Sequence, residues 1–413
     1  MDTMRQKQPS QIFNDLPDKR KKVFHLMCQG KTDADIAEAM GIEESTVRKH
    51  IENLGDDFNI GTDKDHSDER HSRREGLLEI GQELGLVPFE FYIERPPIET
   101  ICYQEILKPG SLLRIRASKQ MGKTLLMTQI FEEAKKQGYK TANWNLLQLQ
   151  EDEITNIDKL LRSLCIAVTR SLNLNHSLAD LWDKTIGSKD NCTYYLEDYI
   201  LSNLEFPLVL GLDNVDRVFH LETISTNLFG LLRSWYEKAK TNELWQKIRF
   251  VVAYSTSNYP KLSINNSPFN VGKSIELPGF NTEQVQDLSR RYGIAVDSNT
   301  VNRLMNMVDG HPYLVRQMFE QIEANPNLTI EEILETAPTN AGIYTNYLRD
   351  ISDTLKQSVE LAAAFKIVLE ADQPVRIDDE LAFKLDSLGL VAKEGNHVTP
   401  RCNLYRLYFK ERL

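Results

Sequence analysis

The chain has 413 residues, which at the usual ~100–200 residues per domain indicates about two to four domains. Its composition, 41% hydrophobic and 26% charged, is that of an ordinary globular protein and argues against disorder or a fibrous architecture. A formal net charge of -11 argues against a protein that coats nucleic acid with its whole surface, although one small face could still bind it.

Apolar runs and cysteines narrow the class of protein further. No apolar run approaches the ~20 residues that a membrane span needs, and the N-terminus lacks the apolar region of a signal peptide. We therefore expect a cytoplasmic protein without a membrane partner. The five cysteines are scattered and lack C-x-x-C spacing, which argues against a disulfide framework and against a zinc site.

Residues 1–87 form the first block, which we predict to be all-helical. Apolar residues recur at helical spacing in RKKVFHLMCQ, DADIAEAM and STVRKHIENL, with breakers at Gly30 and Gly41. We expect a solvated turn over 61–74 and a further helix in EGLLEIGQELGL. The second and third segments fit the spacing of a helix-turn-helix, whose core positions are Ile36, Ala37, Val47 and Ile51.

DNA binding by this helix-turn-helix depends on the exposed positions of its second helix. Those positions are Ser45, Thr46, Arg48 and Lys49. Residues 1–55 hold nine Lys or Arg against nine Asp or Glu, so any attraction to phosphates must come from one face. A protein adaptor and a purely structural helical bundle stay open as alternatives.

Residues 88–100 contain three prolines and no helical period, so we place a linker there. From 101 to 280, strand-like apolar runs alternate with amphipathic helices, as in SLLRIRA, GKTLLMTQIFEEAKK, KTANWNLL, PLVLGLDNV, LFGLLRSWYEKAK and IRFVVAYST. This alternation predicts an α/β fold with a parallel sheet covered by helices on both faces. Ligands of such sheets bind beyond the carboxyl ends of the strands.

The stretch RASKQMGKT, residues 116–124, follows the first of these strands and opens a helix. It fits the phosphate-binding pattern G-x-x-x-x-G-K-[ST] except at the first glycine, where Ala117 stands. We expect Gly122 to allow close backbone approach, Lys123 to reach the β- and γ-phosphates, and Thr124 to bind Mg²⁺ through its hydroxyl. An alanine is strained at 117 only if the backbone there is left-handed. The alternative is a chance G-K-T at a helix start.

A second motif, PLVLGLDNVDRVF, places Asp213 at the end of the most apolar strand, where a carboxylate can orient Mg²⁺. The following position often carries a glutamate that activates water, but Asn214 cannot accept a proton. Asp216 is the nearest alternative catalytic carboxylate. We therefore expect at most a weak ATPase, in which ATP or ADP acts as a switch. A buried strand that ends in an Asp helix cap is the alternative.

Further polar residues near these motifs have two interpretations each. Thr256, at the end of IRFVVAYST, could sense the γ-phosphate or simply form a turn. Arg217 and Arg233 could supply charge to a neighbouring nucleotide or form surface salt bridges.

The C-terminal third is predicted to be mainly helical. VDGHPYLVRQ has the pattern of a turn followed by a helix with Pro312 near its start. After residue 346 the pattern predicts helices followed by a short hairpin, VAKEG-NHVTP, which is typical of a winged helix.

From about residue 92 the sequence resembles the AAA-like domains of cyanobacterial signalling and conflict proteins, a branch of the STAND class of P-loop NTPases. The matching segments are IERPPIE, RIRASKQMGKT, GLDNVDRVF, FGLLRSWYEKAK, SPFNVGKSIELPGF, GHPYLV and PRCNLYRLYF. The resemblance implies a switch that is closed with ADP and often oligomeric with ATP. It also implies that a Gly-x-Pro element, here Gly310 to Pro312, packs on the adenine. In this class the winged helix usually closes over the nucleotide; DNA binding by it is the alternative.

The N-terminal block resembles the LuxR-type helix-turn-helix and also the effector-associated N-terminal domains of conflict systems. Two functions therefore stay open: a nucleotide-switched regulator that reads DNA, and an adaptor that recruits a separate effector protein. The predicted domains are a helix-turn-helix (1–87), a linker (88–100), a P-loop NTPase core (101–280), a helical lid (281–345) and a winged helix (346–413).

Overall fold

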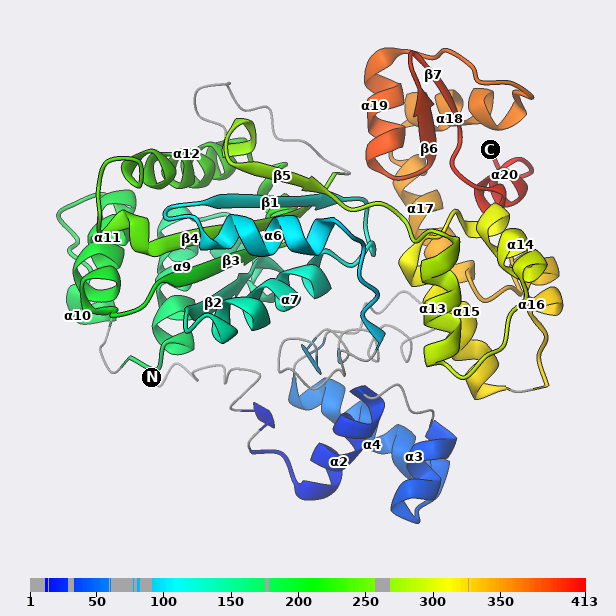
Figure 1. Ribbon diagram of the computed structural model, residues 1–413, viewed down its shortest axis with the longest axis horizontal. Coiled ribbons are helices and arrows are strands. Elements are labelled where there is room, and N and C mark those ends of the chain that lie inside the picture. The colour runs from blue at the N-terminus through cyan, green and yellow to red at the C-terminus, as the bar shows by residue number, and fades with distance from the viewer. Residues whose placement is uncertain are drawn as a thin grey trace. The chain divides into compact units, whose positions relative to one another are not determined.

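The computed structural model describes residues 12–13, 15–28, 33–58, 60, 77, 80–81, 91–174, 178–256, 268–325 and 327–413 (Figure 1). The chain divides into two compact units. The first comprises Met1–Tyr92, Arg291–Gly293 and Glu320–Asn327, and the second comprises Ile93–Arg290, Ile294–Phe319 and Leu328–Leu413.

The first unit contains three helices that the sequence predicts: α2 (Asp18–Cys28), α3 (Asp33–Met40) and α4 (Glu44–Asp57). Gly41 takes φ 64° in the turn between α3 and α4, a conformation that favours glycine. The four predicted core positions are buried, which confirms the helix-turn-helix spacing: Ile36, Ala37, Val47 and Ile51. The predicted turn over 61–74, most of the helix predicted after it and the boundary at 87 lie outside the described residues.

The second unit is built on a parallel sheet of five strands in the order β2-β3-β4-β1-β5. The strands are β1 (Leu112–Ala117), β2 (Lys140–Asn145), β3 (Leu208–Asp213), β4 (Ile248–Ser255) and β5 (Lys273–Glu276). The predicted parallel sheet is thus confirmed, with β5 as an additional strand. Because β4 pairs with both β1 and β3, the carboxyl ends of these three strands lie side by side.

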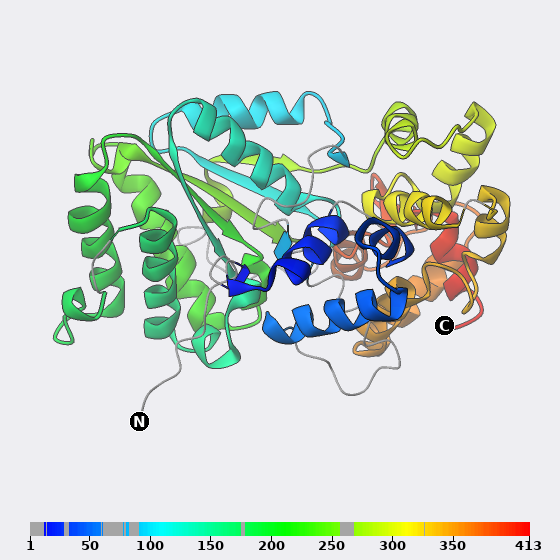
Figure 2. The same cartoon turned by 90° about the horizontal axis from the view of Figure 1, so that it is seen from below.

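Helices cover both faces of the sheet, so β3 and β4 are buried along their whole length (Figure 1). One face packs against α6 (Ile98–Leu107) and α7 (Lys123–Lys136). The other packs against α9 (Ile157–Ser171) and α12 (Glu222–Lys238); Figure 2 shows these layers from below. Two separate apolar cores thus fix the strand ends from both sides.

Shorter elements connect these layers. They are α8 (Glu151–Ile154), α10 (Leu178–Leu181), α11 (Ser188–Tyr194), the π-helix η3 (Tyr195–Ile200), and the 3₁₀ helices η2 (Leu146–Gln148), η4 (Leu201–Asn203), η5 (Val215–Val218), η6 (Trp245–Lys247) and η7 (Pro268–Asn270).

The C-terminal third is helical apart from one hairpin. Its helices are α13 (Thr282–Arg291), α14 (Ser298–Val308), α15 (Pro312–Ala324), α16 (Ile330–Thr336), α17 (Thr345–Lys356), α18 (Val359–Glu370), α19 (Asp379–Ser387) and α20 (Asn403–Phe409). The predicted hairpin is present as antiparallel β6 (Val391–Glu394) and β7 (His397–Pro400). None of the helices in the described part of the chain is long and apolar enough to span a bilayer.

Candidate functional site

The loop between β1 and α7 contains the predicted phosphate-binding residues. Gln120 and Gly122 have positive φ, 60° and 90°. Ala117 has no positive φ and ends β1 as ordinary strand, in register with Ser255 of β4. The alanine in place of the first glycine therefore introduces no backbone strain.

Gly122 precedes α7 and needs to be glycine for two reasons. Its φ of 90° is a conformation that side chains rarely adopt, and a Cβ atom there would lie 2.9 Å from Nη2 of Arg95. The first N–H groups of α7 have no partner within the helix, and the helix dipole adds partial positive charge at this end. An anion fits here.

Lys123 is the first residue of α7 and is 9% exposed. Its Nζ atom donates to the carbonyl oxygens of Ser118 at 2.7 Å and Ala117 at 3.3 Å. Burial lowers the pKa of Lys123 to about 8, while the charges of Asp216 and Asp213 act in the opposite direction. The ammonium group thus lies within the loop that surrounds it.

Thr124 and Asp213 meet across the site. The Thr124 hydroxyl donates to Oδ2 of Asp213 at 2.7 Å, and the other carboxylate oxygen accepts the N–H of Asn214 at 2.9 Å. Asp213 is 1% exposed, and its burial raises the pKa of the carboxyl group. A hydroxyl and a carboxylate side by side are hard oxygen ligands suited to Mg²⁺.

A Mg²⁺ ion at this pair would need further ligands from outside the protein. Among the described residues, no group of three or more His, Cys, Asp or Glu side chains could hold a metal ion. Mg²⁺ usually keeps several waters and takes phosphate oxygens besides one or two carboxylates, so the Thr124–Asp213 pair fits a magnesium-nucleotide complex better than a free ion.

Two residues after β3 have side chains that are already engaged. Asn214 takes a left-handed conformation with φ 56°, and its amide donates to Oδ1 of Asn145, the last residue of β2, at 3.0 Å. Oδ1 of Asp216 accepts the N–H of Ser255 at 2.8 Å. The Asp216 carboxylate therefore ties η5 to the end of β4.

Thr256 connects the end of β4 to two other segments. Its N–H donates to the carbonyl oxygen of Ala117 at 3.1 Å, and its hydroxyl donates to the carbonyl oxygen of Ser387, at the end of α19, at 2.7 Å. The residue predicted to sense a γ-phosphate thus binds the C-terminal helices.

The two arginines mentioned with these motifs have partners within the chain. Arg217 donates to the carbonyl oxygens of Leu146 and Leu149 at 2.7 and 2.6 Å, and Arg233 pairs with Glu237 at 2.7 Å on α12. These bonds favour structural roles for both residues.

The turn before α15 lies against the loop. Pro312 is the first residue of α15 and is buried, and His311 before it is 6% exposed. Burial lowers the pKa of His311 to about 4, and the charges of Arg401 and Lys123 add to this, while a hydrogen-bonding contact with the Lys119 backbone opposes it. His311 is therefore a neutral imidazole between the loop and the C-terminal helices at neutral pH.

The four predicted DNA-contacting residues are all exposed on α4: Ser45, Thr46, Arg48 and Lys49. Arg48 forms ion pairs with Glu44 at 2.6 Å and with Asp33 at 3.6 Å. The Ser45 hydroxyl donates to Glu43 at 3.2 Å. Acidic side chains therefore compete with phosphates for this face.

Arg95 is a residue of the site whose role the sequence does not predict. It is 4% exposed, and its Nη1 atom donates to the carbonyl oxygen of Met121, inside the loop, at 2.8 Å. In the sequence, Arg95 precedes two prolines and lies in IERPPIE, one of the segments that carry the family resemblance, but neither signal indicates where the guanidinium group lies.

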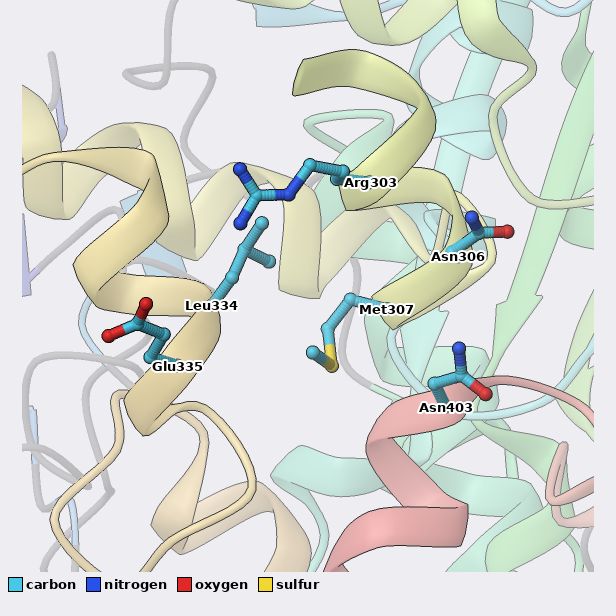
Figure 3. Close-up of a pocket in the computed structure, with 6 residues that line it drawn as sticks. All are labelled: Arg303, Asn306, Met307, Leu334, Glu335 and Asn403. Atoms are coloured by element: carbon cyan, nitrogen blue, oxygen red, sulfur yellow. The ribbon is translucent and has the colours of Figure 1, made fainter. Parts of the chain in front are cut away.

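A separate hollow of about 220 Å³ lies between α14, α16 and the start of α20 (Figure 3). Its lining residues are Arg303, Asn306, Met307, Leu334, Glu335 and Asn403. None of the predicted site residues lines it, and Arg303 is paired with Glu331 at 2.9 Å. The hollow is therefore distinct from the loop site.

The fold and the site together define a P-loop NTPase: a parallel sheet, a G-K-T loop after β1 and a buried aspartate at the end of the strand two places away. The chain belongs to the AAA-like domain family, whose model matches residues 86–411. Residues 15–63 match the family described as bacterial regulatory proteins, luxR family, which confirms the predicted LuxR-type helix-turn-helix.

One solved structure shares this fold. The Walker-type ATPase PABY2304 of Pyrococcus abyssi is similar with a TM-score of 0.55 and 12% identity, over 77% of this chain and 96% of that one. The Aeropyrum pernix ORC2 protein (ADPNP-ADP complexes) has a TM-score of 0.45 and 14% identity, over 75% of this chain and 90% of its own. The first likeness shows the fold alone, and the second is too weak to carry an argument. No curated protein matches the sequence.

Proposed function

We propose that this protein is an ATP- and Mg²⁺-binding switch of the STAND type, whose nucleotide state controls DNA binding by the N-terminal helix-turn-helix. The observation that carries the proposal is the meeting of Lys123, Thr124 and Asp213 beyond the adjacent ends of β1, β4 and β3. The luxR-family match supports DNA as the output.

The phosphates would lie at the N-terminus of α7. Gly122 allows its backbone to approach them, and Lys123 exchanges its two carbonyl partners for the β- and γ-phosphate oxygens. Thr124 and Asp213 would hold Mg²⁺, which would neutralise phosphate charge. Ala117 contributes through its carbonyl oxygen, which orients both Lys123 and Thr256.

Hydrolysis at this site would be slow. Asn214 has no basic group, and its side chain is bonded to Asn145. Asp216, the alternative base, already accepts the N–H of Ser255. A nucleotide that is cleaved slowly persists long enough to define a state, as a switch requires.

The winged helix is the element that would respond to the nucleotide. The Thr256 hydroxyl donates to Ser387, and a γ-phosphate would compete for the same hydroxyl. A Cβ on Gly389 would lie 2.8 Å from Oγ of Ser118, so the turn after α19 packs closely on the loop. ATP can shift the docking equilibrium of the winged helix only through a higher affinity for the undocked state. A difference of about 1.4 kcal/mol in binding free energy between the two states changes the docking equilibrium constant about tenfold.

Two further assignments follow from the STAND resemblance. Pro312, at the start of α15, would pack on the adenine, and release of the winged helix would permit a nucleotide-dependent homo-oligomer. The first turn of α19 carries Asp379 and Glu380, which is unfavourable for DNA contact, so we assign the winged helix to closure rather than DNA binding.

A protein adaptor that recruits a separate effector without reading DNA is the second candidate. The ion pairs of Arg48 with Glu44 of α4 and Asp33 of α3 favour it, because they neutralise a cation on the helix that would enter the groove.

Equilibrium binding of ATP and ADP with Mg²⁺, together with the molar mass in each state, tests the proposal. We expect Lys123→Ala to weaken ATP binding more than tenfold and to abolish any mass change. Lys136→Ala, at the exposed far end of α7, is the matched control and should behave as wild type. Equal affinity in the Lys123 variant would reject the loop as the nucleotide site.

A further inference from the structure

Arg95 lies in the segment that enters the second unit, which begins at Ile93, two residues after Phe91. Its own N–H donates to Oε1 of Glu99 at 2.9 Å, and both side chains are nearly fully buried, at 4% and 3% exposed. Two buried charged residues thus fix this short segment against the start of α6.

The guanidinium group joins its own segment to two others that are far away in the sequence. Nη1 donates to Met121 in the loop at 2.8 Å and to Pro278, just after β5, at 3.3 Å. The group also lies over the ring of Phe280, with Cζ 5.3 Å from its centroid. The adjacent carbonyl oxygen of Glu94 accepts a bond from Gln284 of α13 at 2.7 Å. The segment is therefore bonded to the loop, to the stretch after β5 and to α13.

The same guanidinium group packs on the residue that precedes α7. Its Nη2 atom lies 2.9 Å from the position of a Cβ on Gly122, whose φ is 90°. Bonding to Met121 and packing on Gly122 act on two consecutive residues, so Arg95 restricts the peptide that presents the first N–H groups of α7.

Arg249 shows what a purely structural arginine looks like in this protein. It is also 4% exposed and donates to the carbonyl oxygens of Ile106 at 3.1 Å and Gln246 at 2.8 Å. Its Cζ atom lies 5.1 Å from the centroid of the Tyr139 ring. Arg249 is the second residue of β4, at the amino end of the strands, whereas the loop lies at their carboxyl end. The two residues differ in that Arg95 bonds the phosphate-binding loop.

We propose that Arg95 is a positioning residue of the nucleotide site: it holds the backbone of residues 121–122 in the form that accepts phosphates and ties this backbone to the segment that leads to the helix-turn-helix. The inference rests on the proposed nucleotide binding at the loop. Arg95 does not touch the nucleotide. Through Arg95, nucleotide binding at the loop also affects the segment of residues 93–99.

The experiment compares the full-length wild type with Arg95→Ala, Arg95→Lys and the matched control Arg249→Ala. ATP, ADP and adenosine are titrated by calorimetry, and hydrogen exchange of residues 93–99 is measured with and without Mg-ATP. We expect Arg95→Ala to weaken the binding of ATP and of ADP at least tenfold and to leave the affinity for adenosine within twofold of wild type. It should also abolish the protection of residues 93–99 from hydrogen exchange by ATP. Arg95→Lys should restore part of both effects, because an ammonium group can still reach one carbonyl oxygen.

Arg249→Ala should lower the thermal midpoint yet keep wild-type affinities and wild-type protection of 93–99. Equal losses of ATP affinity in the Arg95 and Arg249 variants would reduce Arg95 to a structural role and overturn the inference. Wild-type ATP affinity in Arg95→Ala would also overturn it while the proposed function stands. No ATP binding by the wild type itself would reject both. If Arg95→Ala does not fold, the ATP affinity of Arg95→Lys and its protection of residues 93–99 are compared with those of Arg249→Ala in the same way.

Discussion

At the scale of single residues, the phosphate-binding pattern has two glycine positions, 117 and 122, and the loop requires glycine only at the second. Gly122 has φ 90° and contacts Arg95, whereas Ala117 has ordinary strand geometry. The first position of the phosphate-binding pattern therefore tolerates a side chain here, and the second does not.

This difference gives a prediction for two reciprocal variants. Gly122→Ala should destabilise the protein by roughly 1–2 kcal/mol from its left-handed φ alone, and should weaken ATP binding. Ala117→Gly should leave ATP affinity within twofold and lower stability by about 0.5–1 kcal/mol through backbone entropy. Urea denaturation and ATP titration measure both. A gain of tenfold or more in affinity for Ala117→Gly would show that the alanine impairs the loop.

His311 gives a pH dependence whose sign can be worked out. Its pKa is about 4 in the folded protein and 6.5 ordinarily, so below pH 6.5 the unfolded chain binds a proton that the folded chain does not. The contribution of His311 to the free energy of unfolding is therefore fully present above pH 6.5. It decreases as the pH falls to about 4, by up to about 1.4 kcal/mol per pH unit. His311→Gln should remove this part. Denaturant melts of both proteins at pH 7.5, 6 and 5 test it, and parallel pH profiles would contradict it.

At the scale of elements, strands β1 to β4, helices α7 and α12 and the β6–β7 hairpin could be predicted, because each has a strong local pattern. Strand β5 has only four residues, three of them exposed, so it lacks an apolar run. Helix α6 follows directly on two prolines and lies within and beyond the predicted linker. Asp213 could be placed beside Thr124, 89 positions away, because parallel topology brings strand ends together.

The contacts of Arg95 and Thr256 could not be predicted in this way. Thr256 bonds a carbonyl oxygen 131 positions away, and Arg95 bonds one 26 positions away, beyond α6 and β1. Neither contact repeats along the chain, and both depend on how whole elements pack, so no periodic pattern records them.

Docking of the winged helix through Thr256 is testable with an isosteric change. Thr256→Val removes the hydroxyl and leaves the Ser387 carbonyl oxygen without this donor, which should weaken docking by about 0.5–1.5 kcal/mol. We expect faster hydrogen exchange in α19 and a lower ratio of ATP to ADP affinity, since the same hydroxyl is proposed to meet the γ-phosphate. Thr128→Val, whose hydroxyl bonds only its own helix at Thr124, is the control. Unchanged exchange in α19 would show that this bond does not hold the winged helix.

At the scale of the whole molecule, the two family matches place a P-loop NTPase after a helix-turn-helix in one chain. A net charge of -11 opposes association with DNA in general, so DNA binding must come from a local face and be strongly salt-dependent. The exposed residues Arg48 and Lys49 are the cations on α4 that can contact DNA phosphates.

If nucleotide controls DNA binding, one assay must show that the DNA affinity depends on the nucleotide and on the salt concentration. Fluorescence anisotropy with genomic fragments should give tighter binding with Mg-ATP than with Mg-ADP, and a log–log salt slope that becomes less steep by about two in Arg48→Ala/Lys49→Ala, since each phosphate contact contributes about 0.9. The double variant should keep wild-type ATP affinity, because it leaves the loop intact. If wild type binds DNA equally with either nucleotide, the two domains act independently. If it shows no salt-sensitive binding at all, the acidic residues beside Arg48 dominate this face, and recruitment of a protein effector becomes the output of the switch.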